Sequence, residues 1–339
     1  MVAAHPSADE EALLDWNESP IGPPALAVKR VIDAAGRLHR YPRGLMEEVA
    51  ALAAAHFGVA PGNVLLTAGV DEAIDITLSI AARAWGVKPG FDGYEDRVLA
   101  NGKEFHPIPL GPDWQPTAAP DPAIGPDDIV YLAQPGNPTG NLHPAEWIAQ
   151  VRAAAGHVFI DETYQEFCSG PSALRRRADR PWDPRLLVYR SFSKAAGLAG
   201  IRLGCLIGDQ ETIARLEPRR RFMPIDAVSL NAVAGLLEEP EFMDRLSAYV
   251  REARAGLTAR LRASGLFEEV RPSEANFVLA KPYPQAADAL AGQLRADLVR
   301  VKDCTVLGMP GWLRISVSSE DDRARFDASL DRVVQALPV

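Results

Sequence analysis

The sequence predicts an α/β protein with a large domain built on a mostly parallel sheet and a smaller α+β domain. The chain has 339 residues, more than one hydrophobic core usually organises, which favours two domains. Short apolar runs alternate with helical patterns through its middle, as in a parallel sheet whose strands are linked by helices. Polar residues follow three of these runs closely, at the sheet edge where ligands bind in such folds.

The larger part of the chain carries the parallel-sheet pattern. Residues 45–57 have apolar side chains at helical spacing and stop at Gly58, a residue that favours a helix end. Helices are also expected over residues 71–85, which start just after Gly69, and over residues 144–154. Five short apolar runs are expected to be buried strands: residues 64–67, 129–132, 158–160, 186–189 and 203–207.

The last part of the chain predicts a smaller unit. A long helical stretch over residues 238–263 leaves the large domain. The elements expected after it are strands over residues 276–280, 299–302 and 313–317 and a helix over residues 321–337. We therefore expect a large domain of residues 36–235 and a small domain of residues 236–339, against which residues 1–35 pack as an N-terminal arm.

Composition excludes several classes of function. A net charge of −9 argues against nucleic-acid binding as the main role. Three widely spaced cysteines give no disulfide framework and fit a reducing cytosol. Six scattered histidines show no metal-ligand spacing, so no metal is expected. Neither a signal peptide nor an apolar run of membrane-spanning length is visible, so we expect a cytoplasmic protein without a membrane partner.

One Gly/Ala-rich stretch suggests the chemistry. Residues 191–204 read SFSKAAGLAGIRLG, and small residues let the backbone approach a ligand closely. Ser191, Ser193 and Arg202 suit a phosphate. Lys194 suits a carbonyl, because a desolvated amine can form a Schiff base. Phosphate and aldehyde in one ligand describe pyridoxal 5′-phosphate, although a polar loop with a surface lysine would use the same residues.

Three polar residues at strand ends could surround the ring of that cofactor. Asp161 follows an apolar strand directly and would keep the pyridine nitrogen protonated, which makes the ring an electron sink; a helix cap is the alternative. Tyr164 and Asn137 could both hydrogen-bond the phenolic oxygen and lower the pKa of the cofactor–lysine linkage. For Asn137, in QPGNPTG, a tight turn is the alternative.

The turn TAGVDEA after the strand over residues 64–67 offers a second phosphate site. Gly69, Val70 and Asp71 would supply backbone amides at a helix start, or the Asp71 carboxylate would cap the helix instead. Phe91 or Tyr94 could stack on the cofactor ring, although an aromatic side chain is more often part of the core.

Two arginines stand inside apolar strands. Arg314, in WLRIS, is a charge of a kind seldom buried without an anionic partner. The substrate's carboxylate or phosphate would serve, and a structural salt bridge is the alternative. Arg300, in LVRV, has the same character and could help to hold a substrate phosphate.

Taken together, these motifs give a resemblance that spans nearly the whole chain. The sequence resembles fold-type I pyridoxal-phosphate aminotransferases (class I/II) and, within them, the histidinol-phosphate aminotransferase family. The motifs that carry it are, in chain order, NESPIGP (17–23), YP (41–42), GVDE (69–72), NPTG (137–140), DETY (161–164), the lysine stretch (191–204), ANF (275–277) and LRI (313–315).

The resemblance implies a seven-stranded type of central sheet and a role for each motif. Lys194 would carry the cofactor and shuttle a proton between the substrate Cα and C4′, with Asp161 on the pyridine nitrogen and Tyr164 and Asn137 on the ring oxygen. The phosphate would be held by Gly69, Val70, Asp71, Ser191, Ser193 and Arg202. Tyr41 would reach the neighbouring subunit's phosphate, which implies a homodimer with shared sites. The substrate would contact Arg314, Arg300 and Asn17.

The leading hypothesis is a ping-pong transaminase that moves an amino group from an anionic amine, most simply histidinol phosphate in histidine biosynthesis, to a 2-oxo acid such as 2-oxoglutarate. Two alternatives stay open within the fold. One is an aminotransferase for an aromatic or specialised-metabolism amino acid, and the other is a decarboxylase or other lyase acting on a phosphorylated amino acid. A non-catalytic regulatory module is a third hypothesis, but the chain has no spare length or basic helix for a DNA-binding domain.

Overall fold

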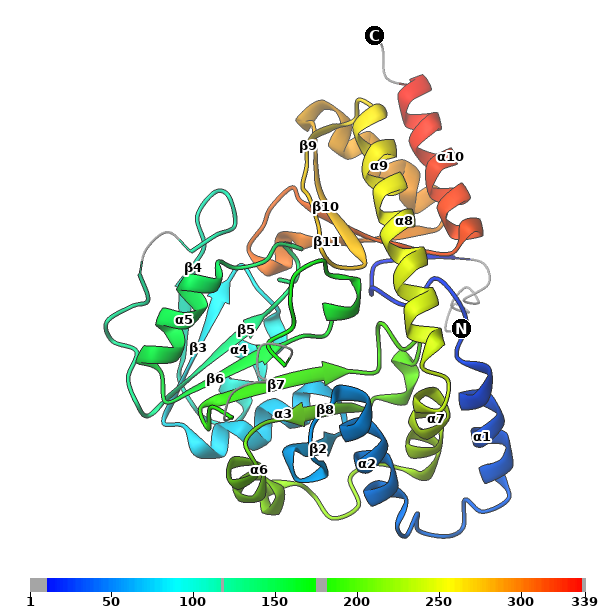
Figure 1. The fold of residues 1–339 in the computed structure, drawn as a ribbon. Coiled ribbons are helices and arrows are strands. Elements are labelled where there is room, and N and C mark those ends of the chain that lie inside the picture. Colours follow the sequence, from blue (N-terminus) through cyan, green and yellow to red (C-terminus); the bar gives the residue numbers. More distant parts are fainter. Residues whose placement is uncertain (1–10, 117–118, 175–181, 337–339) are drawn as a thin grey trace, which may run out of the picture.

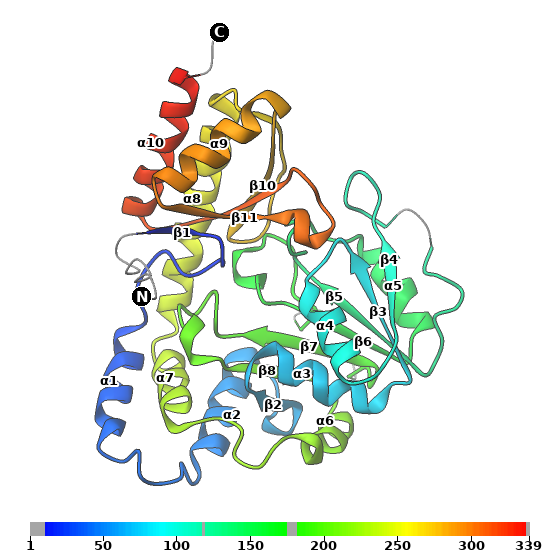
Figure 2. The ribbon, with the colours of Figure 1, turned by 180° about the vertical axis from the view of Figure 1, so that it is seen from behind.

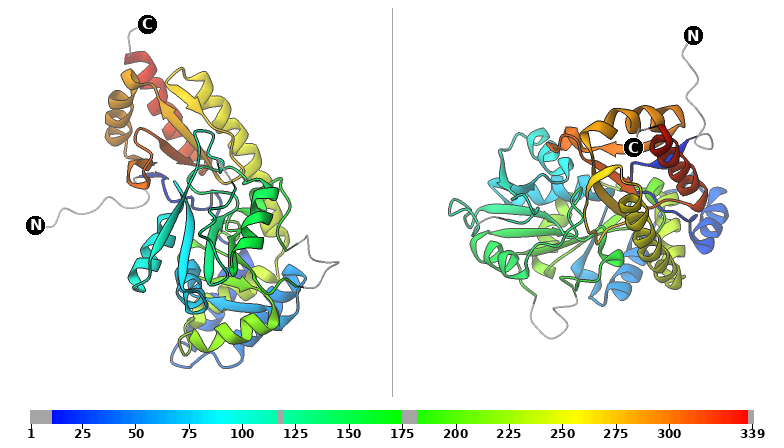
Figure 3. Two further views of the ribbon diagram at one scale, coloured as in Figure 1. Left: turned by 90° about the vertical axis from the view of Figure 1, so that its left-hand side faces the viewer. Right: turned by 90° about the horizontal axis from the view of Figure 1, so that it is seen from above.

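Two sheets organise the protein, which is described by a computed structural model covering residues 11–116, 119–174 and 182–336. A seven-stranded sheet lies in the lower part of Figure 1, and a five-stranded sheet lies above it. The views in Figure 3 show the smaller sheet and its helices seated over the larger part. The protein therefore has an α/β body with a smaller α+β part, as predicted.

The larger sheet is mostly parallel. Its strands lie side by side in the order β2-β8-β7-β6-β5-β3-β4, and only β8 is antiparallel to its neighbours. The seven strands are β2 (Val64–Thr67), β3 (Arg83–Lys88), β4 (Phe105–Pro109), β5 (Asp128–Ala133), β6 (His157–Asp161), β7 (Leu186–Ser191) and β8 (Gly204–Ile207). The seven-stranded, mostly parallel sheet that the resemblance implied is confirmed.

Helices cover both faces of this sheet, so its central strands have apolar residues at nearly every position. Tyr131 and Phe159 pack towards α3, α4 and α6, whereas Val130 and Val158 pack towards α5. The helices are α2 (Leu45–Phe57), α3 (Gly69–Thr77), α4 (Asp92–Ala100), α5 (Ala145–Ala154), α6 (Gln210–Leu216) and α7 (Ala227–Leu237). Burial on both faces makes the sheet a rigid platform for whatever follows its strands.

The smaller sheet has the order β1-β11-β12-β10-β9 and is antiparallel except for β1, which runs parallel to β11. Its strands are β1 (Ala12–Leu14), β9 (Phe267–Val270), β10 (Phe277–Pro282), β11 (Val299–Asp303) and β12 (Leu313–Ser316). The helices of this part are α8 (Glu241–Ala263), α9 (Pro284–Ala296) and α10 (Glu320–Ala336). The long helix α8 links the two parts (Figure 1).

The N-terminal segment belongs to both parts of the molecule. Strand β1 lies at the edge of the smaller sheet beside β11, and helix α1 (Ala25–Ala35) packs against α7 below it (Figure 2). Residues 15–24 of the N-terminal arm join β1 to α1. The division at residues 35 and 235 stays a prediction.

Two of the predicted helices were wrong in extent. The helix expected over residues 71–85 ends at Thr77, and β3 follows it as a separate strand. Strand β3 lacks the large apolar residues of a typical buried strand because one of its faces carries small residues. The Phe105 ring fills the space beside them, since a Cβ at Gly86 would lie 2.9 Å from it. The helix expected from residue 238 begins at Glu241, because α7 ends at Leu237 and Pro240 lies between the two helices.

No helix in the described parts of the chain is both long and apolar enough to cross a membrane.

Candidate active site

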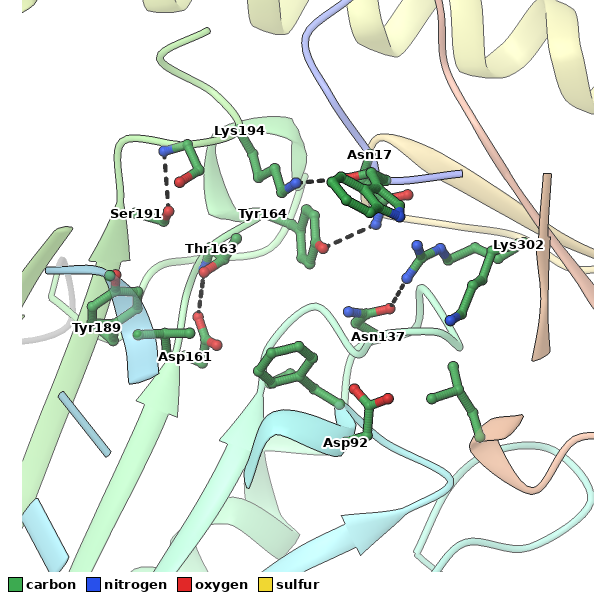
Figure 4. Close-up of a pocket in the computed structure, with 18 of the residues that line it drawn as sticks. Asn17, Asp92, Asn137, Asp161, Thr163, Tyr164, Tyr189, Ser191, Lys194 and Lys302 are labelled. Atoms are coloured by element: carbon green, nitrogen blue, oxygen red, sulfur yellow. Dashed lines mark hydrogen bonds between the residues drawn. The ribbon is translucent and has the colours of Figure 1, made fainter. Parts of the chain in front are cut away.

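A cavity of about 290 Å³ lies where the carboxyl ends of β5, β6 and β7 face the smaller sheet and the N-terminal arm. Most of the predicted site residues line it, although they come from segments far apart in the sequence. They are Asn17, Gly69, Val70, Phe91, Asn137, Asp161, Tyr164, Ser191, Ser193, Lys194, Arg202 and Arg314. Figure 4 shows side chains of the cavity wall, among them those of Asn17, Asn137, Asp161, Tyr164, Ser191 and Lys194.

Lys194 follows β7 and reaches across to the N-terminal arm. Its ammonium nitrogen donates a hydrogen bond to the backbone carbonyl of Trp16 at 2.6 Å. Burial and then the positive charge of Arg314 lower the pKa of Lys194 to about 8. A lysine with this pKa is neutral in a useful fraction of molecules near neutral pH, and the neutral amine is the nucleophilic form.

Asp161 ends β6 as a buried carboxylate held by neutral donors. The Thr163 amide and hydroxyl donate to one oxygen at 3.0 and 2.6 Å, and the Tyr94 hydroxyl donates to the other at 2.9 Å. Burial raises the pKa of Asp161, while these hydrogen bonds oppose the shift. A carboxylate in this setting is well suited to a cationic ligand group, because a counter-charge would repay the cost of its desolvation.

A second set of groups joins the two sheets through side-chain hydrogen bonds. Arg314 donates to the Asn137 side-chain oxygen at 2.6 Å, so the Asn137 NH₂ group is left for another acceptor. The Asn17 amide nitrogen donates to the Tyr164 hydroxyl at 3.0 Å. Asn137 and Tyr164 therefore line the cavity with partners fixed behind them.

The start of α3 and the lysine loop form a cradle for an anion. Arg202 donates to the Ser193 hydroxyl at 3.1 Å, and the Ser193 amide donates to the Ser191 hydroxyl at 3.1 Å. Gly69, with φ +80°, begins α3 opposite them, and a Cβ there would lie 3.0 Å from an Arg202 nitrogen. Free amides at a helix start, two hydroxyls and a guanidinium in one place match a phosphate group.

Four of the predicted residues lie elsewhere. Asp71 is exposed on α3, where Glu72 rather than Asp71 accepts the Ala68 amide. Tyr94 is buried, does not line the cavity and donates a hydrogen bond to Asp161. Of the two candidate stacking aromatics, Phe91 is the one that lines the cavity. Tyr41 is 71% exposed and does not line the cavity of its own chain.

Arg300 is the fourth. It lies opposite Leu13 at the β1 edge and forms an ion pair with Glu11 at 2.6 Å. Lys302, two residues further along β11, lies beyond the reach of β1 and lines the cavity instead. It is directly opposite Arg314 in the antiparallel pair β11–β12. The sequence signal was present in LVRVKD, but choosing between the two cations requires the pairing of β1.

Other lining residues were missed by the sequence reasoning. They are Trp16, Asp92, Ala133, Thr163, Tyr189, Lys302 and Leu307. Thr163 lies inside the recognised motif DETY and was visible there, and Asp92 follows the candidate aromatic Phe91 directly. Tyr189 precedes Ser191 on the same face of β7, which strand alternation could have shown.

The donor set fits pyridoxal phosphate. The cradle matches its phosphate, the Asp161 carboxylate matches its ring nitrogen, and the amine of Lys194 matches its aldehyde. Among the buried polar atoms without a hydrogen-bond partner in the described residues, two belong to residues of the cavity wall: the Tyr189 hydroxyl and the Arg314 Nε. Buried polar atoms without partners are costly, and both residues line this cavity, which fits a polar ligand.

Comparison with known proteins gives a consistent result. Residues 11–333 match the family model for aminotransferase class I and II. A histidinol-phosphate aminotransferase from Acidovorax sp. (strain JS42) is 34% identical over 94% of this chain and 90% of its own length.

Two solved structures share the fold. The histidinol-phosphate aminotransferase from Sinorhizobium meliloti, solved in complex with pyridoxal-5′-phosphate, has a TM-score of 0.80 at 24% identity, covering 96% of this chain and 91% of its own. The L-threonine-O-3-phosphate decarboxylase from Porphyromonas gingivalis has a TM-score of 0.79 at 20% identity, covering 95% and 99%. At these identities the likeness is one of fold alone.

Proposed function

This chain belongs to the class I and II aminotransferase family and is a transaminase that uses pyridoxal phosphate, and we propose that its amino donor is a phosphorylated amine, histidinol phosphate. The acceptor would be a 2-oxo acid such as 2-oxoglutarate, and the two substrates would bind in turn. The similarity to the Acidovorax histidinol-phosphate aminotransferase supports this donor. The reaction would belong to histidine biosynthesis.

The observation that carries this proposal is a pair of cations in the cavity wall. Lys302 and Arg314 are directly opposite each other on neighbouring strands, where like charges are unfavourable unless an anion lies between or beside them. The hydrogen bonds of Arg314 go to neutral acceptors, the Asn137 side chain and the Asp15 carbonyl. Two positive charges facing one cavity favour a substrate with a carboxylate or, better, a doubly charged phosphate.

Pyridoxal phosphate, when bound, supplies the carbonyl that captures an amine and the ring that delocalises electrons from the substrate Cα. Lys194 would hold the cofactor between turnovers, and its amine would move the proton at the substrate Cα. The lowered pKa of Lys194 supports both roles, because a base must be neutral to accept a proton. The Trp16 carbonyl, 2.6 Å from this amine, would orient it whenever it is free.

The remaining wall residues would hold the ring in place. Asp161 would keep the pyridine nitrogen protonated, and Thr163 and Tyr94 would orient its carboxylate. Phe91 would stack on the ring, since it lines the cavity and Tyr94 does not. Asn137 and Tyr164 would donate to the phenolic oxygen. The phosphate would be held by the backbone amides of Gly69, Val70 and Asp71 and by Ser191, Ser193 and Arg202.

We propose in addition a homodimer with shared sites in the cytoplasm. Exposed apolar residues gather on and after α1, among them Val28, Ile32 and Leu38, and Tyr41 follows them. Such a surface favours association, and Tyr41 would reach the cofactor phosphate of the partner. Residues 36–235 would form the cofactor-binding domain, and residues 1–35 with 236–339 the small domain.

The test is a trapping experiment followed by a donor screen. Protein supplied with the coenzyme should turn yellow, and borohydride should fix the coenzyme on Lys194 but not on a Lys194→Ala variant. Histidinol phosphate should then convert the bound coenzyme to its amine form, and 2-oxoglutarate should restore the colour. Failure of every donor in a broad panel would refute the proposal. Carbon dioxide release without an oxo-acid acceptor would assign a decarboxylase instead.

A further inference from the structure

Asn17 in the N-terminal arm is one of the points where hydrogen bonds connect the two parts of the molecule. It is 1% exposed, and its backbone has a φ of +55°, a left-handed conformation that is uncommon for a side-chain-bearing residue. Asn276 donates to its carbonyl at 3.0 Å, and the Ser316 hydroxyl accepts its amide at 2.9 Å. These contacts with the smaller sheet fix the backbone and therefore the direction of the side chain.

The side-chain amide of Asn17 is oriented by Ser316. The Ser316 hydroxyl oxygen already accepts the Asn17 backbone N–H, and its own proton goes to the Asn17 side-chain oxygen at 2.8 Å. The NH₂ group therefore points the other way, where it donates to the Tyr164 hydroxyl oxygen at 3.0 Å. In this orientation each polar group of the pair has a matching partner.

A hydroxyl that accepts from Asn17 must send its own proton elsewhere. Burial raises the pKa of Tyr164, so the hydroxyl keeps that proton. The Phe277 ring packs against the Tyr164 ring at right angles, with 5.4 Å between the ring centroids, and carries no oxygen or nitrogen that could accept the proton. The direction left for the proton is the cavity, which Tyr164 lines.

We propose that Asn17 is a positioning residue that turns the Tyr164 proton towards the phenolic oxygen of the cofactor. The role assigned to Asn17 is thus to act through Tyr164, beyond the substrate contact that the family resemblance implied. This inference rests on the placement of the cofactor proposed above. It predicts that the hydrogen-bonding character of residue 17, and not only its size, controls the pKa of the bound cofactor.

The experiment is a pH titration of the visible absorbance of the holoenzyme. In Asn17→Asp the ionised side chain only accepts, so it draws the Tyr164 proton away from the phenolic oxygen. That oxygen's negative charge is then less stabilised, and the pKa of the chromophore should rise by roughly one unit or more. In Asn17→Leu, which has a similar shape but no donor, the rise should be smaller, roughly half a unit.

The same two variants made in a Tyr164→Phe background separate this role from packing and from bare charge. A direct effect of the carboxylate charge introduced at position 17, or of altered packing, shifts the chromophore equally in both backgrounds and cancels in the double-mutant cycle. Only the part of the pKa shift that depends on the Tyr164 hydroxyl is lost in the Tyr164→Phe background. Asn63→Ala is the matched control, because Asn63 is also buried but donates to Gly208 outside the cavity; it should leave the chromophore pKa unchanged.

Ser316→Ala tests the same claim without touching residue 17. It removes the hydrogen bond that orients the Asn17 side-chain amide, so the chromophore pKa should rise by a smaller amount, and this rise should also depend on Tyr164. This variant is informative even if the Asn17 variants fold poorly. If neither the Asn17 variants nor Ser316→Ala produces a shift that depends on Tyr164, the inference is overturned. A wild-type protein without a band that borohydride traps on Lys194 would refute the proposed cofactor placement instead, so the two failures are distinguishable.

Discussion

Replacing Lys302 by methionine should weaken the use of a phosphorylated donor without damaging the cofactor site. Methionine keeps most of the apolar stem of the lysine but removes the charge that faces Arg314 across β11 and β12. No ion pair within the described residues involves Lys302, so the variant leaves no buried acid without a partner. The matched control is Arg300→Met on the same strand, because Arg300 lies outside the cavity in an ion pair with Glu11.

The size of the effect follows from the interaction that is lost. A hydrogen bond to a charged group contributes about 1.5–3 kcal/mol, which corresponds to about a 10- to 150-fold loss in kcat/KM. The loss should be mainly in KM, because a contact to a remote phosphate is the same in the ground state and the transition state. The Arg300→Met control loses an ion pair that lies outside the cavity, with the arginine 51% and the glutamate 12% exposed, and its KM should be unchanged.

The assay compares a phosphorylated donor with the same amine lacking phosphate, both with excess 2-oxo acid. The unphosphorylated donor should be used poorly by the wild type and no worse by Lys302→Met. Equal losses for both donors would refute the assignment of Lys302 to the phosphate and indicate a general effect on the site. A KM change in Arg300→Met as large as that in Lys302→Met would show that the strand, and not the side chain in the cavity, matters.

Three further predictions concern the cofactor site and its support. The rate of coenzyme capture by the apoprotein should rise with pH and level off above about pH 8, because the neutral Lys194 amine reacts and its pKa is lowered to about 8. Stopped-flow absorbance measures this rate, and a rate that still rises steeply at about pH 10, as for an ordinary lysine, would contradict the prediction. Glu162→Gln should lower the free energy of unfolding by about 1–3 kcal/mol, measured by urea denaturation, because it removes the buried charge that pairs with Arg190 at 2.9 Å, although Glu166 still pairs with Arg190; an unchanged free energy of unfolding would contradict it. Gly69→Ala should destabilise the apoprotein by about 1 kcal/mol through its φ of +80° and weaken coenzyme binding through contact with Arg202; unchanged affinity in a coenzyme titration would count against the cradle.

Local patterns predicted the parts of the fold that local interactions determine. The bounds of α2 and β2 match the expected ranges at both ends, because α2 stops at a left-handed glycine, Gly58, and β2 is an unbroken apolar run. Strand β3 was hidden because its small residues, Ala84 and Gly86, make room for Phe105 from a neighbouring strand. Phe105 lies outside the stretch of residues from which the helix over residues 71–85 was predicted, so the local pattern did not reveal this packing.

The candidate site divides in the same way. Lys194, Asp161 and Tyr164 were recognisable because each lies in a short motif directly after an apolar strand. The choice of Lys302 over Arg300 depends on how far β1 extends along β11, a contact between segments nearly 290 residues apart. The partnership of Asn17 with Tyr164 likewise joins residues that are 147 positions apart. Residue types were therefore predictable, whereas their pairings needed the three-dimensional structure.

The hydrogen bonds of Asn17 have a consequence for how the protein is made. Residue 17 leaves the ribosome early, yet two of its partners are Asn276 and Ser316. Domains generally fold as they emerge, and contacts between distant segments form late. A nascent chain therefore assembles its larger sheet well before translation ends. The N-terminal arm, which contacts Lys194 through Trp16, cannot dock on the smaller sheet until its last strands have been made. Activity would then begin only in molecules whose synthesis has passed residue 316.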